Sequence, residues 1–158
     1  MICSGKSTYA SNAAKKGLII CNDDSIVNLL HGNHYTLFNK KLKILYKSIE
    51  NHILTMSLGM GLSVLVDRGL CVSAKGRRRW LSLAKSFDVP CEAIVFPNEG
   101  PEVHAKRRFE QDNRGHTYEY WLKTAQAHYD NYMVPSWEED FAKVHFITWQ
   151  EIKKGRVI

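Results

Sequence analysis

The stretch MICSGKST, residues 1–8, decides how the rest of the chain is interpreted. Its Gly-Lys-Ser sequence matches the end of the phosphate-binding loop motif G-x-x-x-x-G-K-[ST], the Walker A motif. In such a loop, backbone N–H groups and a helix N-terminus surround the phosphates, the lysine neutralises them and the hydroxyl binds Mg²⁺. The motif therefore predicts a bound nucleotide and Mg²⁺, with Ser7 as the metal ligand. The predicted nucleotide-binding residues are Ser4, Gly5, Lys6, Ser7 and Thr8.

Helical patterns alternate with short apolar runs along the first two thirds of the chain. Alternation of this kind predicts an α/β fold with a parallel sheet and helices on both faces. The expected helices are 8–16, 40–57 and 75–87, and the expected strands are 18–21, 63–67 and 91–96.

The last third of the chain is more polar. We expect helices at 104–112 and 117–132, separated by a break at 113–115, and then an apolar run at 144–147. The chain contains no internal repeat and no low-complexity linker. We therefore expect a single domain over residues 1–158, with a basic helical lid at about 100–132.

The composition restricts the class of partner. A net charge of +6 favours anionic partners such as nucleotides or nucleic acid. No apolar run approaches the roughly 18 residues of a membrane span, so we expect a cytoplasmic protein without a membrane partner. No obligate protein partner is evident. The four cysteines are dispersed without metal-ligand spacing, which favours reduced structural thiols over a zinc site.

Acidic residues follow two of the expected strands. Asp23 and Asp24 come directly after the run 18–21, and Asp67 ends the run 63–67. Ligands of open parallel sheets bind beyond the carboxyl ends of the strands, so these side chains are candidates for a site. Two simpler interpretations stay open: one of the first two aspartates caps the following helix, and Asp67 is a turn residue.

The order of these motifs carries a family resemblance. The series ICSGKST, IICNDDS, SVLVDRG, a basic helix and then RRFEQDNRG resembles the P-loop kinase family of the T-even bacteriophage polynucleotide 5′-kinase domain, over residues 1–147. Related small kinases, zeta-toxin-like and antibiotic phosphotransferase members among them, share much of this order. The resemblance implies a three-layer P-loop NTPase-type fold and ATP-dependent transfer of the γ-phosphoryl group to a hydroxyl.

The resemblance also implies roles for individual residues. Asp23 matches the general base that accepts the proton of the attacking hydroxyl. Asp67 would orient the acceptor or hold water around Mg²⁺. Arg114 and Arg108, or Arg107 in place of Arg108, match lid arginines that stabilise charge on the transferred group.

Three neighbouring arginines begin the basic helix that follows Asp67. Arg77 and Arg78 are candidates for substrate binding, provided that at least one of the set Arg77, Arg78 and Arg79 faces the cleft. The alternative interpretation is a solvated basic face.

Two positions depart from the family pattern. Ile26 stands where the phage kinase has an arginine that helps to hold the acceptor, and Asp67-Arg68-Gly69 replaces Asp-Thr-Asn. The 5′-hydroxyl of a polynucleotide is the first candidate acceptor. A small-molecule or nucleoside acceptor stays open, as does a truncated, non-catalytic nucleotide-binding module.

The family begins with an apolar strand and a glycine that would both precede Met1. We therefore expect the first strand of the sheet to be missing from the chain as given. We favour a recorded sequence that starts late over a degenerate relative, because neighbouring strands would lose backbone hydrogen bonds worth about 1–3 kcal/mol each if buried and unsatisfied.

Overall fold

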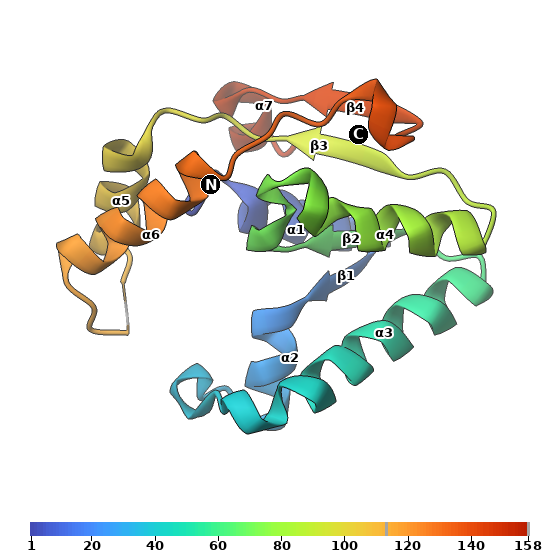
Figure 1. The fold of residues 1–158 in the computed structure, drawn as a ribbon, viewed down its shortest axis with the longest axis horizontal. Helices are drawn as coiled ribbons and strands as arrows, with labels where there is room; N and C mark the ends of the chain where they lie inside the picture. The colour runs from blue at the N-terminus through green and yellow to red at the C-terminus, as the bar shows by residue number, and fades with distance from the viewer. Residues whose placement is uncertain (113, 158) are drawn as a thin grey trace. The chain divides into compact units, whose positions relative to one another are not determined.

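The computed structural model describes residues 1–112 and 114–157, apart from the side chain of residue 70. The chain forms two compact units (Figure 1). Unit 1 consists of Met1–Lys6 and Gly69–Arg156, and unit 2 consists of Ser7–Arg68 together with Val157. The single domain expected over 1–158 stays a prediction, and residue 113 of the expected break at 113–115 lies outside the described residues.

Unit 2 contains a parallel pair of strands, in which Ile19 pairs with Val64 and Asn22 pairs with Asp67. Helix α1 precedes the first of these strands and ends before Gly17, whose φ of 92° is readily adopted by glycine alone. The elements are α1 (Lys6–Lys15), β1 (Ile19–Asn22), α2 (Asp23–Leu30), the 3₁₀ turns η1 (Tyr35–Leu37) and η2 (Lys40–Leu42), α3 (Lys43–Gly59) and β2 (Val64–Asp67).

Helices α2 and α3 pack against each other through a small apolar core. Ile26 and Val27 of α2 contact Tyr46 of α3, and all three side chains are buried. Figure 1 shows the ribbons of the two helices next to each other. This core holds α2, and with it the residues that follow β1, in a fixed position against α3.

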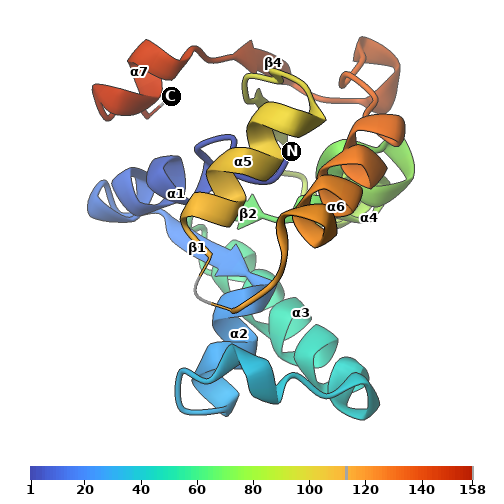
Figure 2. The ribbon, with the colours of Figure 1, turned by 90° about the vertical axis from the view of Figure 1, so that its left-hand side faces the viewer.

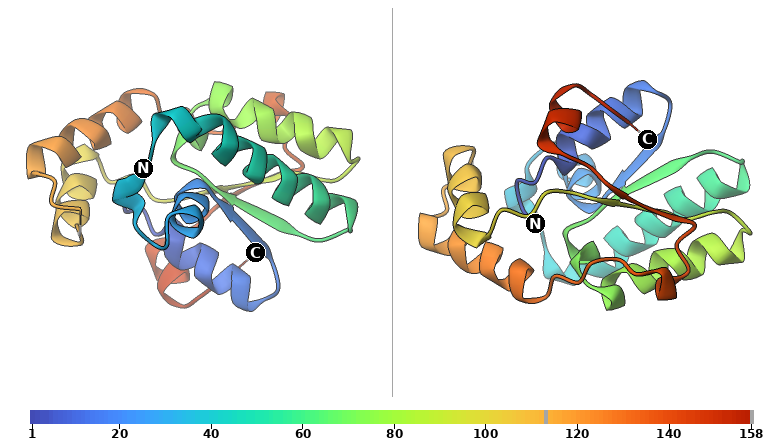
Figure 3. Two further views of the ribbon diagram at one scale, coloured as in Figure 1. Left: turned by 90° about the horizontal axis from the view of Figure 1, so that it is seen from below. Right: turned by 90° about the horizontal axis from the view of Figure 1, so that it is seen from above.

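Unit 1 contains the second parallel pair, in which Glu92 pairs with Lys143 and Val95 pairs with Phe146. The elements are η3 (Gly69–Val72), α4 (Ala74–Ser86), β3 (Glu92–Val95), α5 (Pro101–Glu110), α6 (Tyr118–Asp130), η4 (Trp137–Glu139), β4 (Lys143–Phe146) and α7 (Trp149–Lys153). Helices α5 and α6 lie side by side (Figures 2 and 3), joined by a core of Ala105, Trp121 and Ala125.

The structure confirms the α/β class and the parallel strands. The described residues form two sheets of two strands each. The expected three-layer fold, the absence of its first strand and the helical lid therefore stay predictions. The strand expected at 63–67 is only partly buried, because β2 pairs with β1 alone among the described strands. None of the described helices is long and apolar enough to cross a bilayer.

The buried face of α3 differs from the expected one. Spacings of three and four predict an inner face that includes Leu45 and Met56, but these side chains are 46% and 52% exposed. The buried residues of α3 are Tyr46, Glu50, Leu54 and Ser57. Ile49 and Ile53 of the apolar stripe are partly buried and pack against the same core as Tyr46, so the helix is turned by less than one residue from the orientation that the stripe predicts.

Candidate functional site

The loop before α1 is tied to itself by its own polar groups. The Ser4 hydroxyl donates to the carbonyl oxygen of Met1 over 3.0 Å. The Lys6 amine donates to the same carbonyl and, over 3.3 Å, to the Ser4 hydroxyl. The Lys6 amine therefore lies against the main chain of its own loop, between Met1 and Ser4.

The main chain of this loop alternates in handedness. Cys3 has a φ of 44° and Gly5 a φ of 90°, while Ser4 between them is not left-handed. Alternation of this kind turns successive N–H groups to one side and makes an anion-binding concavity. A Cβ atom on Gly5 would lie 3.0 Å from Ile152 and 3.2 Å from Trp149, so this position has no room for a side chain. The loop thus fits the phosphate-binding role expected of it.

Helix α1 begins at Lys6, directly after the loop. The side chains of Ser7 and Thr8 are exposed in its first turn. An exposed hydroxyl next to a phosphate-binding lysine is the protein ligand that Mg²⁺ uses in P-loops, so the Ser7 donor fits the expected metal. The described residues contain no cluster of three or more His, Cys, Asp or Glu side chains suited to a metal ion, and the ligand role of Ser7 stays a prediction.

Arg108 and Arg107 have different surroundings on α5. The guanidinium of Arg108 lies 4.6 Å from the ring centre of Trp121. Burial raises the pKa of the Cys3 thiol. Among the charged groups that lower this pKa, Arg108 has the largest effect, so Arg108 lies near Cys3 in the loop. Arg107 pairs with Glu99 and lies 4.6 Å over Trp149. These contacts favour Arg108 over Arg107 as the expected lid arginine.

Arg114 lies in the bend that follows α5, in the same unit as the loop. Its backbone N–H donates to the Asp112 carboxylate over 3.0 Å, and the N–H of His116 donates to the same carboxylate over 2.7 Å. Gly115 follows with a φ of 74°. Asp112 thus closes the bend, and the proposed role of Arg114 stays a prediction.

Asp23 is the first residue of α2, at the carboxyl end of β1 in unit 2. The Asn22 side chain caps this helix by accepting from the Ser25 N–H over 2.9 Å. The alternative that Asp23 or Asp24 supplies the cap is therefore wrong. The Asp23 carboxylate instead pairs with Arg68 over 2.8 Å, and its side chain is 42% exposed.

Arg68 also pairs with Glu50 over 2.5 Å, and the Glu50 side chain is only 1% exposed. Burial raises the pKa of Asp23, while the charge of Arg68 acts against this rise. A carboxylate with a raised pKa is a better proton acceptor, as a general base requires. Sequence reasoning missed Glu50, although an acidic residue among the apolar residues of an amphipathic helix is a signal for a buried ion pair.

Asp67 lies at the carboxyl end of β2, next to Asn22 in the register of the two strands. The Asn22 amide donates to the carbonyl oxygen and to the carboxylate of Asp67, over 3.0 and 3.2 Å. Unit 2 thus brings together Asp23, Asp67 and Arg68 at one edge of its sheet.

Arg77 is buried and has several partners within unit 1. It binds both carboxylate oxygens of Glu139, over 2.9 and 2.6 Å, and the carbonyl oxygens of Cys71 and Met133, over 3.0 and 2.8 Å. This arrangement gives Arg77 a structural role, and nothing in it favours the substrate contact expected from the sequence.

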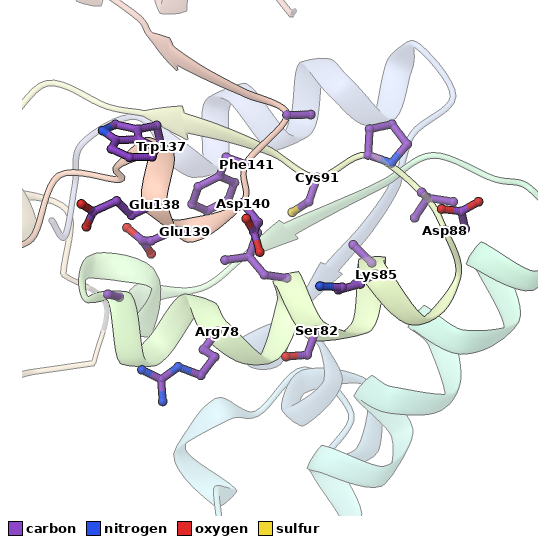
Figure 4. A pocket seen from close by; sticks show the side chains of 16 residues that line it. Arg78, Ser82, Lys85, Asp88, Cys91, Trp137, Glu138, Glu139, Asp140 and Phe141 are labelled. Carbon is purple, nitrogen blue, oxygen red and sulfur yellow. The ribbon is translucent and has the colours of Figure 1, made fainter.

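Arg78 is exposed and lines an open groove between α4 and the segment 137–142 (Figure 4). Other side chains of this groove carry both signs of charge, among them Lys85, Asp88 and Glu138. With Arg78 included, the lining has two basic side chains against four acidic ones, Asp88, Glu138, Glu139 and Asp140, so it does not favour an anionic ligand. A substrate role for Arg78 stays a prediction.

Comparison with known proteins places the chain in a family. The sequence profile described as an AAA domain matches residues 1–130. Proteins of this family have P-loop NTPase-like domains, which generally bind a nucleotide with Mg²⁺, and they include nucleotide and polynucleotide kinases. Among curated proteins, none matches the chain significantly. The matched range includes both the loop at Met1–Lys6 and the strand ends at Asp23 and Asp67, and the chain belongs to this AAA-domain family of P-loop kinases.

Proposed function

We propose that this protein is an ATP- and Mg²⁺-dependent kinase that transfers the γ-phosphoryl group to the 5′-hydroxyl of a polynucleotide. The observation that carries the proposal is the environment of Asp23. Its carboxylate is half-exposed, it is not used as a helix cap, and burial raises its pKa. These are the properties of a general base in a family that includes kinases.

Phosphoryl transfer requires positioning and charge neutralisation more than covalent chemistry. Lys6 and the N–H groups of the loop would hold the phosphates, and Ser7 would bind the metal. Bound Mg²⁺ supplies neutralisation of the phosphate charge. Asp23 would accept the proton of the attacking hydroxyl, and Arg108 and Arg114 would stabilise the charge that develops on the transferred group.

A basic segment in unit 2 supports a polynucleotide acceptor. Residues 25–48 contain no Asp or Glu, and they carry the exposed lysines Lys40, Lys41, Lys43 and Lys47. The same segment holds stacked aromatic rings, with the centres of Phe38 and Tyr46 5.6 Å apart. Phe38 is 40% exposed. Exposed cations combined with aromatic rings are typical of surfaces that bind single-stranded nucleic acid.

A small-molecule or nucleoside kinase is the second candidate. Ile26 supports it, because this residue is 4% exposed within the core between α2 and α3 and gives α2 no basic contact for an acceptor phosphate. A non-catalytic nucleotide-binding module would bind Mg-ATP without transferring phosphate. Binding to the folded state raises the melting temperature, so a thermal shift detects the nucleotide independently of catalysis.

The test combines an acceptor panel with matched variants. The wild type is incubated with radiolabelled Mg-ATP and a 5′-hydroxyl oligonucleotide, a nucleoside or a small alcohol. We expect Asp23→Asn to lower phosphorylation of the oligonucleotide about 10²-fold or more while keeping the Mg-ATP thermal shift. Lys6→Ala should lose both. Asp88→Asn is the control, because it removes an exposed carboxylate of unit 1 that the mechanism does not use.

Three outcomes would contradict the proposal at different levels. Full activity of Lys6→Ala on every acceptor would show that the phosphate-binding role assigned to Lys6 is wrong. Phosphorylation of the nucleoside or the alcohol alone would exclude the polynucleotide. A thermal shift with Mg-ATP but no phosphorylation of any acceptor would favour the non-catalytic module.

A further inference from the structure

Glu50 is a buried acid in the middle of α3. Its side chain is 1% exposed, and it shares the inner face of the helix with Tyr46 and Leu54. Burying a carboxylate costs several kcal/mol unless a partner compensates it. Arg68 is such a partner, because its Nη1 atom lies 2.5 Å from Oε1 of Glu50.

Arg68 connects this buried acid to the candidate base. It follows β2 directly, and its Nη2 atom lies 2.8 Å from Oδ2 of Asp23. Exposure rises along the chain of three side chains, from 1% at Glu50 through 12% at Arg68 to 42% at Asp23. A guanidinium is planar and rigid, so fixing Nη1 also fixes the direction of Nη2.

We propose that Glu50 and Arg68 are positioning residues for the Asp23 carboxylate: Glu50 fixes the guanidinium of Arg68, and Arg68 holds Oδ2 of Asp23. This arrangement leaves Oδ1 to accept the proton of the acceptor hydroxyl. This role rests on the proposed function, in which Asp23 is the general base. The two contacts explain how a base in the first turn of a helix keeps one orientation.

The charges around Asp23 make the two positioning residues distinguishable. Asp24 on α2 and Glu50 on α3 raise the pKa of Asp23 in addition to burial, and Arg68 lowers it. Asp67 ends the neighbouring strand β2 and adds a further carboxylate to this edge. Removing the charge of Arg68 should therefore raise the Asp23 pKa, and removing the charge of Glu50 should lower it.

The experiment measures the Asp23 pKa by ¹³C NMR of its carboxyl group and the acid limb of kcat/KM for the full chain. We expect Arg68→Met to move both upward by about 1 unit and Glu50→Gln to move both downward. Shifts of opposite sign would show that both charges act on the Asp23 carboxylate, and Arg68→Lys then tests whether they also position it. Lys75→Met, which removes an exposed cation on α4, is the matched control and should leave both values unchanged.

Arg68→Lys separates position from charge. Lysine keeps the positive charge but has no rigid fork to span both carboxylates. We expect its acid limb to stay near that of the wild type while kcat falls about 10- to 100-fold at unchanged KM. Wild-type kcat in Arg68→Lys, or an unchanged Asp23 pKa in Arg68→Met, would overturn the inference.

Arg68→Met removes the guanidinium that pairs with the buried Glu50, so the double variant Glu50→Gln with Arg68→Met provides a second route if the single variant does not fold. Its Asp23 pKa should still rise, because Arg68 influences Asp23 more strongly than Glu50 does. A pKa that does not rise would again overturn the inference. Absence of phosphorylation by the wild type would instead overturn the proposed function, and the NMR titration would still decide whether Glu50 and Arg68 control the carboxylate.

Discussion

Asn22 and Asp67 end the neighbouring strands β1 and β2, and the Asn22 amide joins them by donating to both the carbonyl and the carboxylate of Asp67. The oxygen of the same amide caps α2 by accepting from the Ser25 N–H over 2.9 Å. One side chain therefore fixes the strand ends and the start of the helix that carries Asp23.

Replacing Asn22 should weaken both features. We expect Asn22→Ala to lower the free energy of unfolding by about 1–3 kcal/mol, because the cap and the link between the strands are lost together. Asn22→Ser retains a capping oxygen and should lose less. Urea denaturation measures both variants, and equal stability of Asn22→Ala and the wild type would contradict the roles assigned to this side chain.

Two adjacent arginines on α4 should differ sharply in their effect on stability. Arg77→Ala removes the guanidinium that pairs with the largely buried Glu139 and should cost about 3–5 kcal/mol of unfolding free energy. Arg78→Ala alters an exposed side chain and should change stability by less than about 0.5 kcal/mol. The midpoints of urea unfolding compare the two, and similar losses would show that the contacts of Arg77 do not stabilise unit 1.

Alanine substitutions at two glycines with nearly the same φ should distinguish the cost of backbone strain from the cost of a steric clash. Gly5 has a φ of 90° and Gly17 a φ of 92°, but only Gly5 has neighbours within reach of an added Cβ. Gly17→Ala should cost about 1 kcal/mol through strain alone. Gly5→Ala should cost about 1–3 kcal/mol more, because Ile152 and Trp149 must move. Thermal unfolding without nucleotide tests this order, which equal losses would contradict.

Acid should destabilise the fold through His128. Burial is the largest cause that lowers its pKa to about 4, from about 6.5 in an unfolded chain. Between these values the unfolded chain binds more protons than the folded one, so stability rises with pH and falls as pH is lowered from about 6.5 to 4. His128→Gln cannot titrate and should lose less stability than the wild type between pH 7 and pH 4. Parallel urea curves at pH 7, 5 and 4 measure this difference, and an equal loss in both proteins would exclude His128 as the cause.

Local patterns predicted most of the elements that form the site. The run 63–67 contains β2, and the run 18–21 overlaps β1 but ends one residue before it, with Asp23 and Asp67 at the carboxyl ends of the strands as expected. Helix α7 was missed, although Thr148 and Glu151 form a capping box that marks its start. The periodicity of apolar residues and the helix caps depend on residues that are close in sequence, so they can be recognised in one sequence without knowledge of the fold.

The orientation of α3 could not be predicted in the same way. Its apolar stripe predicts an inner face that includes Leu45 and Met56, but Tyr46 is buried against α2 and Glu50 is buried beside Arg68 instead. An amphipathic pattern averages over a helix and does not detect a buried ion pair, because the partner of the acid lies on another element.

The sequence by itself determined the α/β class, the position of the loop that carries Lys6 and the acidic ends of two strands. Only the tertiary structure decided which charges meet: Asp23 with Arg68, Arg68 with Glu50, and Arg77 with Glu139. The physical reason is that helices, strands and caps arise from interactions within a few residues. Ion pairs between elements depend instead on how whole helices and strands pack, which no local pattern of residues encodes.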